Sequence, residues 1–181
     1  QKKPFLWLYF HCLLLNYYFK KRTMKIICVG RNYVDHAKEL GNDIPDEPVI
    51  FMKPKSALLQ SHIPFYYPEF SNELHYEVEL VLRICKNGRY IPERQASKYY
   101  NALTVGIDFT ARDIQNELKA KGLPWEKAKA WDNSAVIGKW IDTTPALLKE
   151  PINFSLKNNE TIVQEGLSDD MMFSFDQIIA H

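Results

Sequence analysis

The chain has 181 residues, of which 46% are hydrophobic and 25% are charged, a composition ordinary for one globular domain with its own core. Its 23 lysines and arginines nearly balance its 22 aspartates and glutamates, and they form no basic stripe, so the composition argues against a nucleic-acid-binding protein. Cys12, Cys28 and Cys85 are widely spaced and form no C-x-x-C pair, which argues against a disulfide framework or a thiolate zinc site and favours a reducing, cytoplasmic setting.

Residues 1–23 differ from the rest of the chain, because aromatic residues and leucines lie there between pairs of lysines. Their apolar run is interrupted by His11 and Asn16 and is too short to predict a membrane helix. The segment has the basic start of a signal peptide, but no small-residue cleavage site follows. We therefore interpret residues 1–23 as an upstream extension of the gene model and Met24 as the natural start, with a genuine anchor as the alternative.

The pattern after this leader predicts a β-rich chain with a few short helices. Asn87-Gly88 predicts a tight hairpin after the strand that contains Glu77. Thr110 and Asp113 resemble a capping box at a helix start, and Gly122 marks the end of that helix. Strands are predicted at residues 24–29, 49–54, 74–82, 103–109, 135–141, 152–157 and 161–164, and helices at 34–40, 92–103, 110–121 and from 176 onward.

Two glutamates one residue apart are the most informative feature of the strand predicted at 74–82. Glu77 and Glu79 alternate there with apolar residues, so both side chains point to one face, with their Cα atoms ~6.5 Å apart. Two like charges beside a buried face are unfavourable unless a cation joins them. A hard divalent cation with oxygen ligands would do so. The alternative is an ordinary solvated strand face.

A third carboxylate would complete such a metal site. Asp108 lies near the end of the strand predicted at 103–109 and precedes a helix, and strand ends that lead into helix N-termini are common ligand positions. With Glu77 and Glu79 it would form an all-oxygen site, which favours Mg²⁺ or Mn²⁺ over zinc. Taken alone, Asp108 is also compatible with a local turn acid.

Three further groups supply candidate catalytic and binding residues. His36 and Glu39 share a helix face at i and i+3, and a carboxylate beside an imidazole orients it and raises its basicity, as a general base requires. Arg112 and Gln115 have the same spacing and would present a guanidinium and an amide to a carboxylate substrate. Lys129 is an isolated cation in a predicted loop. His36 with Glu39 is also compatible with an exposed helix pair, and Lys129 with a solvated loop lysine.

Five sequence blocks together carry a family resemblance. They are residues 30–36 (GRNYVDH), 48–54 (PVIFMKP), 75–80 (HYEVEL), 106–113 (GIDFTARD) and 121–125 (KGLPW). Taken together and in this order, they resemble the fumarylacetoacetate hydrolase family, most closely its short acylpyruvate hydrolase-like and oxaloacetate decarboxylase-like members. One block alone would be a weak signal, but five in order are specific.

The resemblance implies a fold, a metal and a set of site residues. The fold would be α+β and β-rich, a mixed β-roll with short helices, over a catalytic domain at residues 24–181. The substrate would be a small 2-oxo acid, and the protein would be a homodimer. The implied site has Mg²⁺ or Mn²⁺ bound by Glu77, Glu79 and Asp108, a base formed by His36 and Glu39, and substrate-polarising residues Arg112, Gln115 and Lys129.

The reaction that the resemblance implies is metal-dependent hydrolysis of a C–C bond in an acylpyruvate, such as acetylpyruvate or fumarylpyruvate. Oxaloacetate decarboxylation and isomerisation of 2-hydroxyhepta-2,4-diene-1,7-dioate are alternatives, because each uses metal-stabilised enolate chemistry. The family pattern continues with further strands and a T-G-T-P-x-G loop, which this sequence does not contain before His181. We therefore expect a catalytic domain truncated at the C-terminus, and an inactive metal-binding fragment is the alternative from another class.

Overall fold

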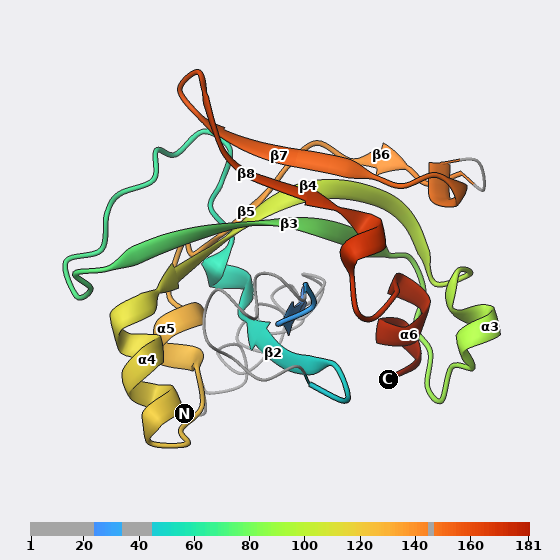
Figure 1. Cartoon of the computed structure of the whole chain (residues 1–181), viewed down its shortest axis with the longest axis horizontal. Coiled ribbons are helices and arrows are strands. Elements are labelled where there is room, and N and C mark those ends of the chain that lie inside the picture. The colour runs from blue at the N-terminus through green and yellow to red at the C-terminus, as the bar shows by residue number, and fades with distance from the viewer. Residues whose placement is uncertain (1–23, 34–44, 145–146) are drawn as a thin grey trace, which may run out of the picture.

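The computed structural model describes residues 24–33, 45–144 and 147–181, and antiparallel strands dominate them (Figure 1). The strands are β1 (Ile26–Gly30), β2 (Val49–Lys53), β3 (Leu74–Ile84), β4 (Tyr100–Ala111), β5 (Ala135–Ile137), β6 (Ile141–Asp142), β7 (Asn153–Asn158) and β8 (Thr161–Leu167). The helices in this part of the chain are α3 (Glu93–Ala96), α4 (Arg112–Ala120), α5 (Glu126–Lys129) and α6 (Phe175–Ala180), with 3-10 turns at Lys55–Ala57, Leu147–Lys149 and Ser168–Asp170. The expected α+β, β-rich fold with short helices is confirmed.

The long antiparallel pair β3–β4 forms the centre of the molecule and arches over β1 and β2 in Figure 1. The short strands β5 and β6 pair with the other edge of β4 and complete a four-stranded sheet. Gly106 is the close-approach residue of this sheet. A Cβ at that position would lie 2.6 Å from the Val136 carbonyl oxygen and 2.8 Å from the Val81 side chain, so only glycine allows this packing.

The β1–β2 pair is a separate sheet that carries a lysine into the interior. Alternation in β2 places Phe51 and Lys53 on the inner face and leaves Ile50 and Met52 exposed on the outer face. Phe51 packs against Trp125, which directly precedes α5, with ring centroids 5.9 Å apart. The β1–β2 pair thus contacts α5 at its start through Phe51 and at its last residue through Lys53, which donates to the Lys129 carbonyl oxygen.

The β7–β8 hairpin forms a third sheet, which runs along β3 and β4 in Figure 1. The chain that follows it returns to the loop after β1. There the Asn32 side chain forms two hydrogen bonds to the backbone of Phe173: Nδ2 donates to the carbonyl oxygen at 3.1 Å and Oδ1 accepts from the amide at 2.9 Å. The buried Asn32 amide thus connects the start of the chain's described part to its end.

Two expectations for the region between β3 and β4 are wrong. Asn87-Gly88 forms no tight hairpin, since residues 85–99, including α3, connect the two strands. A Cβ at Gly88 would lie 2.3 Å from the Tyr99 ring, so packing against that ring explains the glycine. The helix expected at 92–103 is limited to the four residues of α3, because residues from Tyr100 onward belong to the β3–β4 ladder.

The capping box expected at Thr110 is also wrong. The N-cap of α4 is Ala111, without a side-chain cap, because the Thr110 hydroxyl bonds to Lys129 and Asp113 accepts a hydrogen bond from the Ser71 hydroxyl. The predicted helix end is confirmed, with Gly122 at φ +62°. The strand expected at 135–141 is divided into β5 and β6.

The leader at residues 1–23 and the helix expected at 34–40 lie outside the described residues. Within the described ranges, no helix has both the length and the apolar character needed to cross a membrane.

Candidate active site

Glu77, Glu79 and Asp108 lie on one face of the β3–β4 pair. Glu77 is directly opposite Asp108 in the register, and Glu79 is opposite Gly106, two residues along β4. Residues two apart in a strand share a face, and so do residues directly opposite across an antiparallel pair. The alternation of β3 predicted that the two glutamates share a face, and the register brings Asp108 to them.

Lys129 places a cation between two of these carboxylates. It is the last residue of α5, and its side chain is 4% exposed. The Nζ atom lies 2.7 Å from Glu77 Oε2 and 2.8 Å from Asp108 Oδ2, and it donates to the Thr110 hydroxyl at 2.6 Å. The loop lysine of the sequence is therefore a buried helix residue that bridges two strands.

Arg112 and Gln115 lie on the buried face of α4, directly beside this cluster. The Arg112 guanidinium forms an ion pair with Glu77 and donates to the side-chain oxygen of Gln115. Its Nε also lies 3.3 Å from His75 Nδ1. The expected i, i+3 pair is thus formed in the interior, with the guanidinium oriented by both an amide and a carboxylate.

Lys53 is a site residue that the sequence analysis missed. It is 2% exposed, and its Nζ lies 2.8 Å from Asp108 Oδ1. It also donates to the Ser134 hydroxyl and carbonyl oxygens, each at 3.1 Å, and to the Lys129 carbonyl oxygen. The available signal was the alternation of β2, which places Lys53 on the same inner face as Phe51. A lysine on an apolar strand face requires a buried acceptor or counter-ion.

The two glutamates have opposite pKa shifts. Burial, together with the nearby carboxylates of Glu77 and Asp108, raises the pKa of Glu79 to about 8. Burial would also raise the pKa of Glu77, but Lys129 and Arg112 outweigh it and lower this pKa to about 2. At neutral pH Glu77 is therefore ionised, whereas Glu79 is largely protonated.

The pKa values of Lys53 and Lys129 are also shifted in opposite directions. Burial acts to lower both pKa values, but for Lys129 the carboxylates of Asp108 and Glu77 outweigh it, and the pKa rises above its usual range. For Lys53 burial dominates and Asp108 offsets it only in part, so the pKa falls. Lys129 is consequently the more firmly charged of the two ammonium groups.

The chemistry of these donors fits a hard divalent cation, although their arrangement is not that of a formed metal site. The ammonium of Lys129 is itself a cation between Glu77 and Asp108, and Glu79 is a carboxyl group whose ionised form a further cation would stabilise. Asp108 Oδ1 faces Lys53 without hydrogen-bond geometry. As they stand, no three acidic, histidine or cysteine side chains in the described ranges are grouped to hold a metal ion. Metal binding would therefore require the Lys129 ammonium to leave its bridging position.

The predicted base lies outside the described residues. This applies to both His36 and Glu39, so their pairing and their place relative to the carboxylates stay predictions. The structure therefore brings together six of the eight predicted site residues and adds Lys53 to them.

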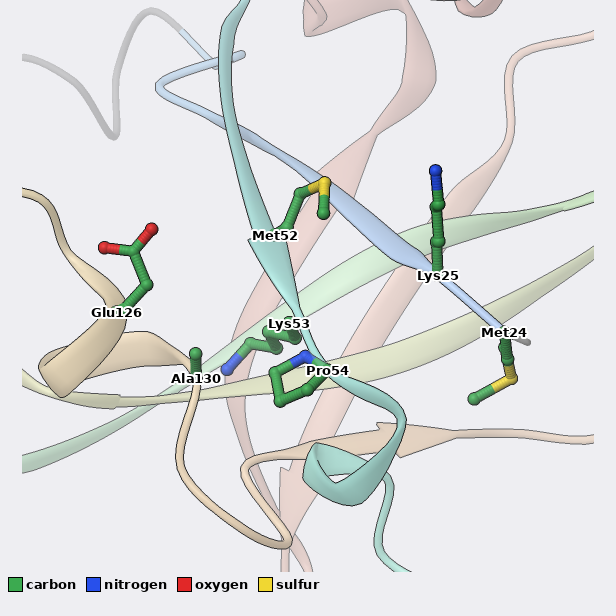
Figure 2. A pocket seen from close by; sticks show the side chains of 7 residues that line it. All are labelled: Met24, Lys25, Met52, Lys53, Pro54, Glu126 and Ala130. Carbon is green, nitrogen blue, oxygen red and sulfur yellow. The ribbon is translucent and has the colours of Figure 1, made fainter. Parts of the chain in front are cut away.

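A pocket of about 360 Å³ lies beside Lys53 (Figure 2). Its lining residues are Met24, Lys25, Met52, Lys53, Pro54, Glu126 and Ala130. In Figure 2 the Lys53 side chain runs toward Ala130, whereas Lys25 points away from it. Lys53 is the lining residue that also contacts the carboxylate cluster.

The chain matches known proteins over most of its length. The profile of the fumarylacetoacetate (FAA) hydrolase C-terminal family matches residues 25–181. A curated relative, the mitochondrial oxaloacetate tautomerase FAHD1 of Arabidopsis thaliana, is 42% identical over 163 residues, which cover 89% of this chain and 72% of that protein.

Two solved structures share the fold. A fumarylpyruvate hydrolase from Pseudomonas aeruginosa, in complex with Mn²⁺ and pyruvate, matches with a TM-score of 0.79 and 34% identity over 87% of this chain and 70% of that chain. A protein of the fumarylacetoacetate isomerase/hydrolase type from Oleispira antarctica matches with a TM-score of 0.83 and 35% identity over 90% of this chain and 73% of that chain. The expected β-rich fold of the fumarylacetoacetate hydrolase type is therefore confirmed.

Proposed function

Because the chain belongs to the fumarylacetoacetate hydrolase family, we propose that it is a Mg²⁺- or Mn²⁺-dependent enzyme that interconverts the keto and enol forms of a small 2-oxo acid of the oxaloacetate class. Glu77, Glu79 and Asp108 would hold the metal ion. The observation that carries the proposal is the register of the β3–β4 pair, which gathers these three carboxylates on one face, beside the buried ammonium of Lys129. The activity in the name of the Arabidopsis relative supports the choice of reaction.

The charged residues divide the chemical work. A divalent cation at the three carboxylates would supply Lewis-acid polarisation of a 2-oxo acid. Lys129 would direct its ammonium at the 2-oxo oxygen of the substrate, where negative charge grows as a proton leaves the adjacent carbon. Its raised pKa keeps this ammonium charged at neutral pH.

Arg112 and Gln115 would bind the substrate carboxylate. A guanidinium offers two parallel donors that match the two oxygens of a carboxylate. Arg112 is 4% exposed and is held by Gln115 and Glu77, so little side-chain freedom would be lost on binding. The proton at the carbon next to the 2-oxo group would be moved by His36, oriented by Glu39.

Oxaloacetate tests this proposal directly. Purified protein with Mn²⁺ should accelerate keto–enol interconversion, followed by the ultraviolet absorbance of the enol. Lys129→Met should lower kcat by about 10²-fold or more, because it removes the donor that faces the developing charge. Lys127→Met is the matched control, since Lys127 is exposed on the same helix. Full activity in Lys129→Met, or equal loss in both variants, would contradict the proposed role.

C–C hydrolysis of an acylpyruvate is the second candidate. It is favoured by the likeness to the Pseudomonas aeruginosa fumarylpyruvate hydrolase. Hydrolysis needs an attacking water, which His36 would activate, whereas oxaloacetate decarboxylation needs none. His36→Ala should therefore reduce acetylpyruvate and fumarylpyruvate hydrolysis far more than decarboxylation. Equal loss of both activities would exclude His36 as the water-activating base.

An inactive metal-binding fragment is the candidate from another class. It predicts saturable Mn²⁺ binding without turnover of oxaloacetate, acetylpyruvate, fumarylpyruvate or 2-hydroxyhepta-2,4-diene-1,7-dioate. Turnover of one of these substrates that disappears on chelation of the metal and returns with Mn²⁺ would exclude it.

The assembly that we propose is a homodimer, and the exposed aromatic loop between β2 and β3 supports it. Tyr66 is 76% exposed and Tyr67 is 69% exposed. The adjacent Phe65 ring instead stacks on the Phe109 ring, with the two ring centroids 4.0 Å apart. Aromatic side chains presented in this way are typical of interfaces. Light scattering across a dilution series should give one dimeric species, and Tyr66→Ser with Tyr67→Ser should shift it to monomer. A monomer already in the unchanged protein would refute the dimer.

The compartment stays a prediction. The cysteine pattern favours a reducing, cytoplasmic setting, whereas the name of the Arabidopsis relative places that protein in mitochondria. Fractionation of source cells with an antibody to this chain would decide between the two compartments.

A further inference from the structure

The Gln164 side chain reaches from the β7–β8 hairpin to the outer edge of β3. Its Oε1 accepts a hydrogen bond from the Val78 amide at 2.9 Å, and its Nε2 donates to the Tyr76 carbonyl oxygen at 2.8 Å. These two backbone groups lie on either side of Glu77. In a parallel sheet, one residue of a neighbouring strand bonds in this way to the residues before and after its partner. The Gln164 amide therefore replaces one residue of an adjoining strand, centred on Glu77.

The backbone of Glu77 is consequently held from both sides. On one side β4 pairs with it, with Asp108 directly opposite. On the other side Gln164 fixes the peptide groups that flank it. Carboxylates that bind a metal ion must be held within about 0.5 Å of their working position, and this precision comes from the groups that support them.

A distortion of the hairpin accompanies this contact. The β7–β8 ladder pairs Leu156 with Gln164 and Lys157 with Ile162, which leaves Val163 without a partner in the register. A bulge of this kind bends a strand and changes the direction of nearby side chains, and bulges occur preferentially beside active sites. The unmatched residue lies immediately next to the side chain that reaches β3.

We propose that Gln164 is a positioning residue for Glu77 and acts on metal binding through the backbone of β3. This inference rests on the proposed function, in which Glu77 is a metal ligand. A side chain of the β7–β8 hairpin therefore affects the metal affinity of a site whose three carboxylates all lie in β3 and β4.

The test compares two identical substitutions in the full chain. Gln164→Met keeps the length of the side chain but removes both hydrogen bonds. We expect Mn²⁺ affinity, measured by calorimetry, to fall about tenfold, and amide exchange at Val78 to become several-fold faster. Turnover of oxaloacetate should return to the wild-type kcat at saturating Mn²⁺, because the site is weakened and not removed. Gln177→Met is the control, since Gln177 also bonds to a backbone amide, at the start of α6, and should leave Mn²⁺ affinity unchanged.

The outcomes separate this inference from the proposed function. Faster exchange at Val78 with unchanged Mn²⁺ affinity would overturn the inference alone. Equal loss of affinity in both variants would also overturn it, because the effect would then be one of general stability. If the unchanged chain does not bind Mn²⁺, the proposed function fails and the inference fails with it.

Discussion

The β3–β4 pair and the β7–β8 hairpin are held in the molecule by different means. β3 and β4 share one continuous backbone ladder, and the register of that ladder fixes where Glu77 and Asp108 lie. The hairpin is bonded within itself and packs along β3, and the side-chain hydrogen bonds described between the two come from the amide of Gln164. The positions of the charges are thus set by the backbone, whereas the support of those positions depends on a few side chains that single substitutions remove.

The substitution with the largest expected effect removes a buried charge next to β4. Lys53→Met removes the ammonium next to Asp108 and leaves the Ser134 carbonyl and hydroxyl groups without this donor. Loss of one partner from a buried ion pair costs about 3–5 kcal/mol. We expect a fall of that size in the free energy of unfolding, measured with urea. Lys55→Met, at an exposed position two residues away, should change it little, and equal stability of the two variants would contradict this role.

A smaller effect separates the two glutamates of β3. In metal-free protein, Glu77→Gln should destabilise the fold by about 2 kcal/mol, because Arg112 and Lys129 each lose a charged partner while the glutamine oxygen still accepts a hydrogen bond. Glu79→Gln should be neutral or stabilising at pH 8, because it removes a carboxyl group that lies near two others. The opposite order of stabilities in urea would show that the charge assignment is wrong.

The raised pKa of Glu79 predicts that the stability of the fold depends on pH. The pKa of Glu79 is about 8 in the folded protein against an ordinary value of 4.5, so the folded protein holds a proton that the unfolded chain releases. This contribution is fully present below pH 4.5 and is lost as the pH rises to 8. With the metal chelated, the stability of the unchanged protein should therefore fall across this window relative to that of Glu79→Gln. Parallel curves for the two proteins would contradict the raised pKa.

The next smaller effect is expected at Asn32, whose side-chain amide lies outside the charged cluster. Asn32→Ala removes both hydrogen bonds to the Phe173 backbone, and we expect a loss of about 1–2 kcal/mol in urea unfolding. Asn72→Ala is the matched control, because the Asn72 side chain is exposed. Limited proteolysis should also cut the segment around Phe173 faster in Asn32→Ala only. An unchanged cleavage rate would show that the amide does not hold this segment.

The smallest expected effect is at an exposed residue of the β7–β8 hairpin. Ile162 is 48% exposed on β8, so Ile162→Thr should change stability by no more than about 0.5 kcal/mol. Its position beside the bulge makes it a control for Gln164, because it alters the same strand and leaves the Gln164 amide in place. A large loss of stability or of Mn²⁺ affinity in this variant would mean that the hairpin depends on more than its amide contact.

The sequence predicted what depends on local alternation and spacing. The shared face of Glu77 and Glu79 follows from the period of a strand, and the pairing of Arg112 with Gln115 follows from the period of a helix. The register between β3 and β4 does not follow, because residues 85–99 connect them and Gly88 within that segment serves packing against Tyr99. Asp108 was therefore a candidate ligand in the sequence, but its place opposite Glu77 was not predictable.

Lys53 was missed and Thr110 was misassigned, because tertiary contacts decide their roles. Lys53 is the last residue of a strand before Pro54, and its ammonium is one of two counter-ions of Asp108. Thr110 has the sequence of a helix cap, but Lys129 uses its hydroxyl instead. In both cases the partner comes from a distant part of the chain, and no short-range pattern indicates it.

The distances along the chain between these charges have a consequence for folding. Lys129 is 52 residues from Glu77 and 21 residues from Asp108, and Lys53 lies 76 residues from the Lys129 carbonyl that it contacts. Non-local contacts of this kind slow folding, because loop closure must precede them. A partly folded state with β3 and β4 paired but α5 undocked would hold its carboxylates together without the Lys129 ammonium. We therefore expect such a state to be electrostatically disfavoured, so that the final docking of α5 coincides with the rate-limiting step and stopped-flow refolding slows in Lys129→Met.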